Sequence, residues 1–149
     1  MRLQGKVAVV TGGGSGIGRG ICLRFAEEGA HIVVADVDEQ GAEQTATMVR
    51  ELGQDALIAA GDVSNHSVVE SLFTNALSEF GHYDILVNNA GILKWGSILD
   101  IPESDWDRII EVNLKSTFLC TREAARYWIK NRKPGKVVNT ASVSGEWAL

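Results

Sequence analysis

The chain has 149 residues, 45% of them hydrophobic and 22% charged, which is the composition of an ordinary globular domain. Its formal net charge of -5, from 14 basic and 19 acidic residues, argues against a nucleic-acid-binding protein, because that function needs a clustered basic surface. The sequence contains no apolar run of the roughly 18 residues that a membrane span needs, and no signal-peptide pattern. We therefore expect a cytoplasmic protein without nucleic-acid or membrane partners.

Apolar runs rich in β-branched residues alternate with helix-period segments along the chain, which predicts βαβ units and a parallel sheet. The expected strands are 7–10, 31–35, 56–60, 85–87 and 136–139, and the expected helices are about 16–28, 39–53, 65–80 and 102–130. Right-handed crossovers then give the strand order 3-2-1-4-5. The predicted fold is a single α/β domain over residues 1–149, a Rossmann-type doubly wound parallel sheet truncated after its fifth strand.

Local signals refine the helices of this fold. The first helix should close at Gly29, Ser64 or Asn65 should cap the third, and Pro102 should lie in the first turn of the fourth. The apolar stripe that we expect to face the sheet from the first helix consists of Ile17, Ile21, Leu23 and Phe25.

Cysteine and histidine residues give no sign of a disulfide or of a metal site. Cys22 and Cys120 lie far apart in separate helix-like segments, and the three histidines are scattered. Neither residue type shows metal-ligand spacing, and no Cys-x-x-Cys pattern occurs. We therefore expect two buried free thiols in a reducing compartment, and no bound metal.

A glycine-rich turn at residues 11–18, Thr-Gly-Gly-Gly-Ser-Gly-Ile-Gly, joins the first strand to the first helix. Glycines let the backbone approach a pyrophosphate closely, and the helix amino terminus adds free amides and a favourable dipole. The spacing fits neither Gly-x-Gly-x-x-Gly nor a P-loop, and such a turn alone could be purely structural. The loop residues expected to contact a cofactor are Gly12, Ser15, Gly16, Ile17 and Gly18.

Asp36 closes the second strand, 18 residues beyond Gly18. This is close to the spacing of about 20 residues expected for the carboxylate that binds the ribose hydroxyls of a dinucleotide. The same carboxylate would repel a 2′-phosphate, and neither position 37 nor position 38 carries a lysine or arginine. These features favour NAD over NADP, the alternative being a solvated turn aspartate.

These features together resemble the short-chain dehydrogenase/reductase family along the whole chain. The Thr-Gly-x-x-x-Gly-x-Gly turn at 11–18 is similar to the family's cofactor loop, and Asp62-Val63 is similar to its adenine-contacting pair. Residues 88–91, Asn-Asn-Ala-Gly, resemble its fourth-strand motif, which supports the sheet and lines the cofactor channel. The resemblance thus adds a second set of expected cofactor contacts: Asp62, Val63, Asn89, Ala90 and Gly91.

The resemblance also implies two catalytic residues. Asn113 matches the helix asparagine that holds a water in the family's proton relay, and Ser142 matches the serine whose hydroxyl binds the substrate oxygen. Ser144 is the neighbouring candidate, although the Ser-x-x-Gly spacing favours Ser142. The family's acid/base pair, Tyr-x-x-x-Lys, is expected downstream of Ser142 and does not occur in this sequence; neither Tyr83 nor Tyr127 is a credible substitute.

The resulting expectation is an NAD-dependent oxidoreductase domain, without its carboxyl-terminal part, that acts on a small alcohol or carbonyl substrate and is inactive alone. The resemblance implies that the full-length parent forms homo-oligomers through the long helix before the fifth strand. Two other readings stay open. One is a non-catalytic NAD-binding fragment or regulatory module, and the other is a methyltransferase, which shares a glycine-rich loop and an acid after the second strand.

Overall fold

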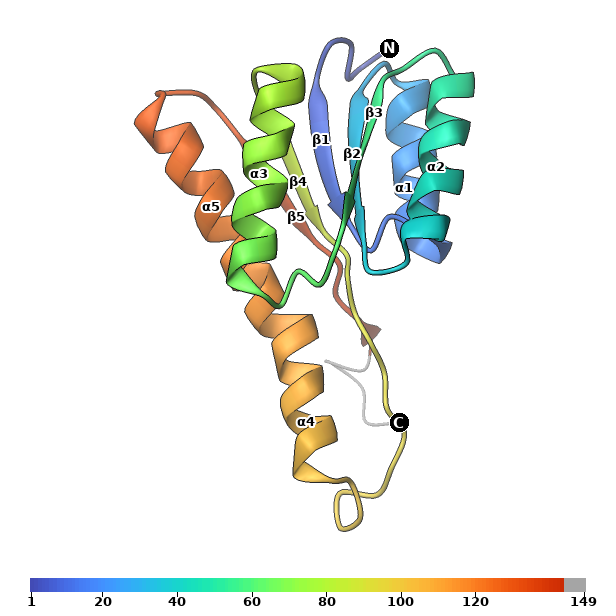
Figure 1. The fold of residues 1–149 in the computed structure, drawn as a ribbon, viewed down its shortest axis with the longest axis vertical. Coiled ribbons are helices and arrows are strands. Elements are labelled where there is room, and N and C mark those ends of the chain that lie inside the picture. Colours follow the sequence, from blue (N-terminus) through green and yellow to red (C-terminus); the bar gives the residue numbers. More distant parts are fainter. Residues whose placement is uncertain (144–149) are drawn as a thin grey trace.

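The computed structural model describes residues 1–143 of the chain, which form a parallel sheet with helices on both faces (Figure 1). The strands are β1 (Val7–Thr11), β2 (His31–Asp36), β3 (Ala56–Ala60), β4 (Ile85–Asn88) and β5 (Lys136–Asn139). The helices are α1 (Gly16–Glu27), α2 (Glu39–Glu51), α3 (His66–Phe80), α4 (Glu103–Ile110), the π-helical η1 (Glu111–Lys115) and α5 (Ser116–Lys130). The observed strand order, β3-β2-β1-β4-β5, confirms the prediction.

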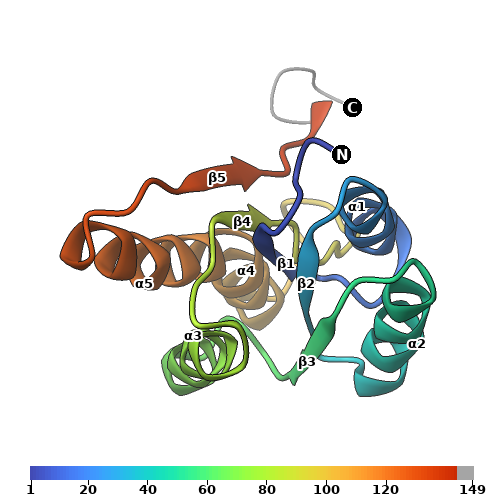
Figure 2. The same ribbon diagram turned by 90° about the horizontal axis from the view of Figure 1, so that it is seen from above.

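The sheet lies between two layers of helices (Figure 2). Helices α1 and α2 cover one face and α3 and α5 cover the other. Successive strand side chains point to opposite faces, so Val9 and Leu86 pack toward α3 and α5 whereas Val10 and Val87 pack toward α1 and α2. This two-sided burial explains why the central strands are continuously hydrophobic.

The face that α1 presents to the sheet differs from the predicted stripe. Gly18, Cys22 and Ala26 are buried, whereas Ile17 is 70% exposed. The other predicted stripe residues, Ile21, Leu23 and Phe25, are half-buried at the rim of the interface. The prediction was wrong for Ile17 because α1 begins so close to β1 that only small side chains fit between them.

The segment predicted as one helix over 102–130 contains a π turn. Pro102 is the N-cap of α4, one position before the predicted first turn, and the helix changes to π geometry over η1 before α5 continues it. A π turn inserts a residue into the helical repeat and is common at functional sites. Here it contains Asn113, one of the two expected catalytic residues.

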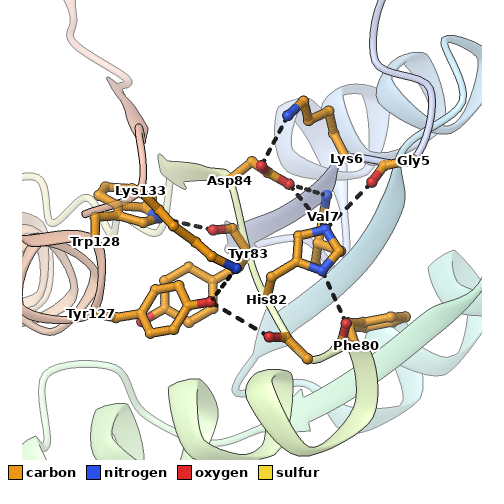
Figure 3. A network of polar contacts seen from close by, with 11 residues as sticks. Gly5, Lys6, Val7, Phe80, His82, Tyr83, Asp84, Tyr127, Trp128 and Lys133 are labelled. Carbon is orange, nitrogen blue, oxygen red and sulfur yellow. Dashed lines mark hydrogen bonds and ion pairs between the residues drawn. The ribbon is translucent and has the colours of Figure 1, made fainter. Parts of the chain in front are cut away.

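A network of polar contacts lies at the amino-terminal ends of the strands (Figure 3). Asp84 accepts hydrogen bonds from the Val7 amide at 3.0 Å and from Lys6 Nζ at 3.0 Å. Trp128 Nε1 donates to the Tyr83 carbonyl at 2.8 Å, so that α5 is attached to the start of β4. These contacts lie at the amino-terminal ends of the strands, opposite the expected cofactor loop. They hold the starts of β1 and β4 and the helix α5 together.

Three further features of residues 1–143 concern cysteines, metal-binding groups and membrane-spanning helices. Cys22 and Cys120 are free and buried, as predicted. No group of three or more histidine, cysteine or acidic side chains within residues 1–143 is arranged to hold a metal ion. None of the helices in this part of the chain is long and apolar enough to cross a membrane.

Candidate functional site

A pocket of about 390 Å³ lies at the carboxyl ends of β1, β2 and β4, where the strand order reverses. In doubly wound sheets this switch point is where ligands bind. The pocket is lined by every residue that we predicted as a cofactor contact: Gly12, Ser15, Gly16, Ile17, Gly18, Asp36, Asp62, Val63, Asn89, Ala90 and Gly91. Residues that lie far apart in the sequence therefore surround one cavity.

The glycines of the loop are needed for two different physical reasons. A Cβ on Gly18 would lie 1.9 Å from the Gly12 carbonyl oxygen, and a Cβ on Gly12 would lie 2.9 Å from the Ala90 Cα. These two positions bring β1, α1 and the segment after β4 into direct backbone contact. Gly16, by contrast, has open space beside it and a φ of +50°, so its role is conformational.

The amino terminus of α1 is open toward this pocket. Its N-cap, Ser15, makes no side-chain capping bond within the described structure, and no acidic residue lies in the first turn. The free amides of this turn carry the positive end of the helix dipole. Arg19 supports the loop from behind, with its guanidinium on the Gly14 carbonyl and its Nε donating to Thr45 Oγ1 at 2.9 Å. The site can therefore bind an anion.

Asp36 is fixed by backbone donors on both of its oxygens. The Gly14 amide donates to Oδ2 at 2.8 Å, and the Asp38 amide donates to Oδ1 at 3.0 Å. A carboxylate has about four acceptor positions, so lone pairs remain for two hydroxyl donors from a ligand. Val37, the next residue, also lines the pocket and is apolar.

Thr11 and Asn89 join the glycine loop to the end of β4. The buried Thr11 hydroxyl accepts hydrogen bonds from the Asn89 amide at 3.0 Å and the Ala90 amide at 3.1 Å. The Asn89 side chain donates back to the carbonyls of Thr11 and Gly12, at 3.2 and 3.3 Å. Thr140, just after β5, donates to Asn89 Oδ1 at 3.2 Å. These hydrogen bonds thus connect the glycine loop, the end of β4 and the end of β5 into one network at the floor of the pocket.

The far wall of the pocket contains an ion pair. Asp62 Oδ1 accepts from the Ser64 amide at 2.9 Å and the Ser64 hydroxyl at 2.7 Å, and Arg108 Nη2 donates to Oδ2 at 2.6 Å. Burial would raise the Asp62 pKa, but the hydrogen bonds from Ser64 and Arg108 outweigh it and hold that pKa below its ordinary value. Asp62 is therefore a carboxylate at neutral pH.

Asn113 lies beside the pocket without lining it. Its Oδ1 accepts from the Ile92 amide at 2.8 Å, and its Nδ2 donates to the Ile92 carbonyl at 2.9 Å. Because both ends of the amide are used, the side chain acts as a clamp on the segment that follows Gly91. The π turn fixes the position of this clamp relative to α4.

Ser142 is exposed just beyond the carboxyl end of β5, and it does not line the pocket. The neighbouring Thr140 does line it. Ser144 lies outside the described residues. Tyr83 is buried in the core between Phe73 and Tyr127. Tyr127 lies near the amino-terminal edge of the sheet, away from the pocket.

The profile of the short chain dehydrogenase family matches residues 6–149. The chain belongs to this family. Two relatives are similar to it: the BbsD subunit of a hydroxy(phenyl)methylsuccinyl-CoA dehydrogenase from Thauera aromatica, 41% identical over 95% of this chain, and 3beta-hydroxysteroid dehydrogenase 2 from Eggerthella lenta, 42% identical over 96%. The chain spans 57% and 55% of the lengths of these relatives.

Solved structures of short-chain dehydrogenases share the fold. A crystal structure of NAD+-bound xylitol dehydrogenase superposes with a TM-score of 0.95 and 33% sequence identity, covering 100% of this chain and 57% of that one. A short-chain type dehydrogenase/reductase from Mycobacterium marinum superposes with the same TM-score, covering 99% of this chain and 60% of that one. The Rossmann-type architecture of this short-chain dehydrogenase chain is therefore established.

Several residues of the pocket were not anticipated from the sequence. Arg108 and Val112 reach the cavity from α4 and η1, and Thr140 reaches it from the end of β5. Arginine on a surface helix gives no local signal of such a role. A larger hollow of about 680 Å³ lies between α3 and α5, away from the carboxyl ends of the strands. The volume of a pocket alone therefore does not identify the site.

Proposed function

We propose that this chain forms the NAD site of a short-chain dehydrogenase that transfers hydride between an alcohol or carbonyl substrate and nicotinamide. The observation that carries the proposal is the pairing of the open α1 amino terminus with a fixed Asp36 carboxylate across one pocket. A pyrophosphate group suits the first feature, and a ribose diol suits the second. Residues 1–149 would thus act as the NAD-binding domain.

The charges around the pocket favour NAD over NADP. Asp36 would repel a 2′-phosphate, and the apolar Val37 offers no compensating cation. The NAD+ in the xylitol dehydrogenase structure supports a nicotinamide cofactor for a chain with this fold. Adenine would lie against Asp62 and Val63, and the nicotinamide half would extend toward Gly91.

When bound, the nicotinamide ring supplies the hydride acceptor or donor. Ser142 would donate a hydrogen bond to the substrate oxygen and stabilise the charge that develops on it. Asn113 holds the segment after Gly91 in place and would contribute to proton transfer. The sequence contains no Tyr-x-x-x-Lys to take up the proton, so we expect this chain alone to bind the cofactor and to turn over substrate slowly.

A second candidate function is a non-catalytic NAD-binding module, which agrees with the positions of Asn113 and Ser142 outside the pocket lining. Both functions require the same pocket, and they differ only in whether a proton acceptor completes the site. Measuring binding and turnover separately distinguishes them, because the module would bind NAD with no detectable oxidation of any alcohol.

Isothermal titration calorimetry of the purified chain with NAD+ and NADP+ tests the proposal. We expect NAD+ to bind in the micromolar to millimolar range and NADP+ to bind at least about tenfold more weakly, since one uncompensated charge repulsion is worth about 1.4 kcal/mol or more. S-adenosylmethionine serves as the control ligand. A folded chain that ignores NAD+ at millimolar concentration, or that prefers S-adenosylmethionine, contradicts the proposed function.

A further inference from the structure

Helix α4 is attached to the rest of the molecule in an unusual way. None of its residues is buried, and it lies beyond the carboxyl ends of the strands (Figure 1). A helix without a buried face gains little from apolar packing. Its position therefore depends on the covalent connection through η1 and on polar contacts from its side chains.

Among residues 1–143, two side-chain contacts reach α4 from outside its own helical segment. One is an exposed ion pair between Lys94 and Asp105, at 3.8 Å. The other is Arg108, which donates to Asp62 Oδ2 at 2.6 Å and to Ser64 Oγ at 2.9 Å. The second contact is shorter, has two donors in a fixed fork, and ends on a wall of the cofactor pocket.

The geometry at Asp62 points to a role for this contact beyond holding α4. Ser64 saturates Oδ1 with two donors, so Oδ2 is the oxygen left to face a ligand. Among the described residues, Arg108 of α4 is the side chain that donates a hydrogen bond to Oδ2. The Asn65 amide fixes the Asp62 main chain through a hydrogen bond of 2.9 Å to its carbonyl. The guanidinium and Ser64 together thus determine how the carboxylate is presented.

The charges around the pocket also support a role for Arg108 in ligand binding. Among the described residues that line the pocket, the charged side chains are Asp36, Asp62 and Arg108. A dinucleotide brings further negative charge into this space through its pyrophosphate. Without Arg108, two carboxylates would face an anionic ligand across a partly enclosed cavity, where charge repulsion is stronger than in bulk water.

We propose that Arg108 is a positioning residue for the adenosine end of the cofactor, which it serves by orienting and neutralising Asp62. The inference rests on the proposed function, since it assigns a residue to that same site. Arg108 touches no reacting atom in this scheme and acts through Asp62. The same helical segment carries Asn113, whose clamp on Ile92 lies on the nicotinamide side, so one segment supports both ends of the pocket.

The test compares Arg108→Met with Lys94→Met. The first variant keeps an unbranched apolar side chain similar to the arginine alkyl stem and removes the guanidinium. The second removes the other contact of α4 without touching the pocket. Calorimetry with ADP-ribose and with NAD+ should show both ligands binding about fivefold to tenfold more weakly to Arg108→Met, because the contact is charged but partly exposed. Lys94→Met should stay within about twofold of the original chain. Arg108→Lys should restore part of the affinity, since an ammonium keeps the charge but lacks the rigid planar fork of the guanidinium.

A second readout does not depend on the cofactor. In the unliganded protein, carbon NMR of the Asp62 carboxyl should show that Arg108→Met raises the pKa of that group toward its ordinary value, with Lys94→Met unchanged. Circular dichroism checks that both variants are folded. An unchanged affinity in Arg108→Met, an equal loss in Lys94→Met, or an unshifted Asp62 titration overturns the positioning role while leaving NAD binding intact. If the original chain fails to bind NAD+, the proposed function itself is overturned.

Discussion

The Gly14 amide and the Asp36 carboxylate are joined by a hydrogen bond of 2.8 Å, which connects the cofactor loop after β1 to the end of β2. The loop and the acid are therefore one structural unit. A Cβ on Gly14 would lie 2.9 Å from the Asp36 carboxyl carbon, so the loop backbone passes directly over the acid. The residue proposed to bind the ribose thus also shapes the loop that would hold the pyrophosphate.

Replacing Asp36 with asparagine tests whether its charge selects the cofactor. The variant removes the negative charge and loses one of the two loop acceptors, so NAD+ should bind about fivefold more weakly. NADP+ should bind more tightly than it does to the original chain, because the repulsion is gone. Calorimetry with both cofactors measures the ratio, and Asp38→Asn, outside the pocket, is the matched control. An unchanged NADP+ to NAD+ ratio would exclude Asp36 as the selecting group.

Gly18→Ala and Gly20→Ala form a pair on the same helix with opposite expected effects. A Cβ at position 18 would collide with the Gly12 carbonyl oxygen, whereas position 20 has nothing within 4 Å. Gly18→Ala should displace the loop, abolish NAD binding and lower the unfolding midpoint. Gly20→Ala should stabilise the protein by up to about 1 kcal/mol, because alanine favours an exposed helix interior. Thermal denaturation compares them, and equal stabilities would contradict the close approach of α1 to β1.

Asn113→Ala should release the segment that follows Gly91. The variant removes both hydrogen bonds to the Ile92 backbone, so the Ile92 amide should exchange with solvent about tenfold faster or more. Hydrogen exchange followed by NMR measures this rate. Asn131→Ala is the control, since its side chain bonds only the Tyr127 carbonyl at the end of α5. Exchange at Ile92 that is equally fast in both proteins would show that the clamp is not formed in solution.

The two cysteines predict how stability changes at alkaline pH. Burial raises the pKa of both thiols from 9.0 to about 12. The unfolded chain therefore loses its thiol protons first, so the stabilisation is complete below pH 9 and is lost as the pH rises from 9 toward 12. Urea denaturation across this range should show a decline that is smaller in Cys22→Ala than in the original chain.

The same burial predicts that both thiols resist alkylation by iodoacetamide at pH 8 in the native protein and react after denaturation. Mass spectrometry counts the modified residues. Rapid labelling of either cysteine in the folded chain would contradict the buried positions of α1 and α5 that contain them.

Much of the fold followed from local sequence signals. Continuous apolar runs such as 7–10 indicate strands buried on both faces. Gly29, with a φ of +94°, lies just past the end of α1, as expected. The α1 interface was predicted wrongly because helical periodicity counts large apolar residues, while the actual contact is built on Gly18, Cys22 and Ala26. Periodicity gives no measure of how closely two backbones approach.

The sequence by itself determined the strand order and the pocket residues that belong to short motifs, because βαβ handedness and short motifs are properties of neighbouring residues. Only the tertiary structure revealed the contribution of Arg108, since its partner Asp62 lies 46 positions away and nothing local to either residue indicates the contact. The same holds for the π turn at Asn113, whose hydrogen-bond pattern no helical propensity predicts. Contacts between distant segments depend on how the layers pack, and packing is decided by the whole chain at once.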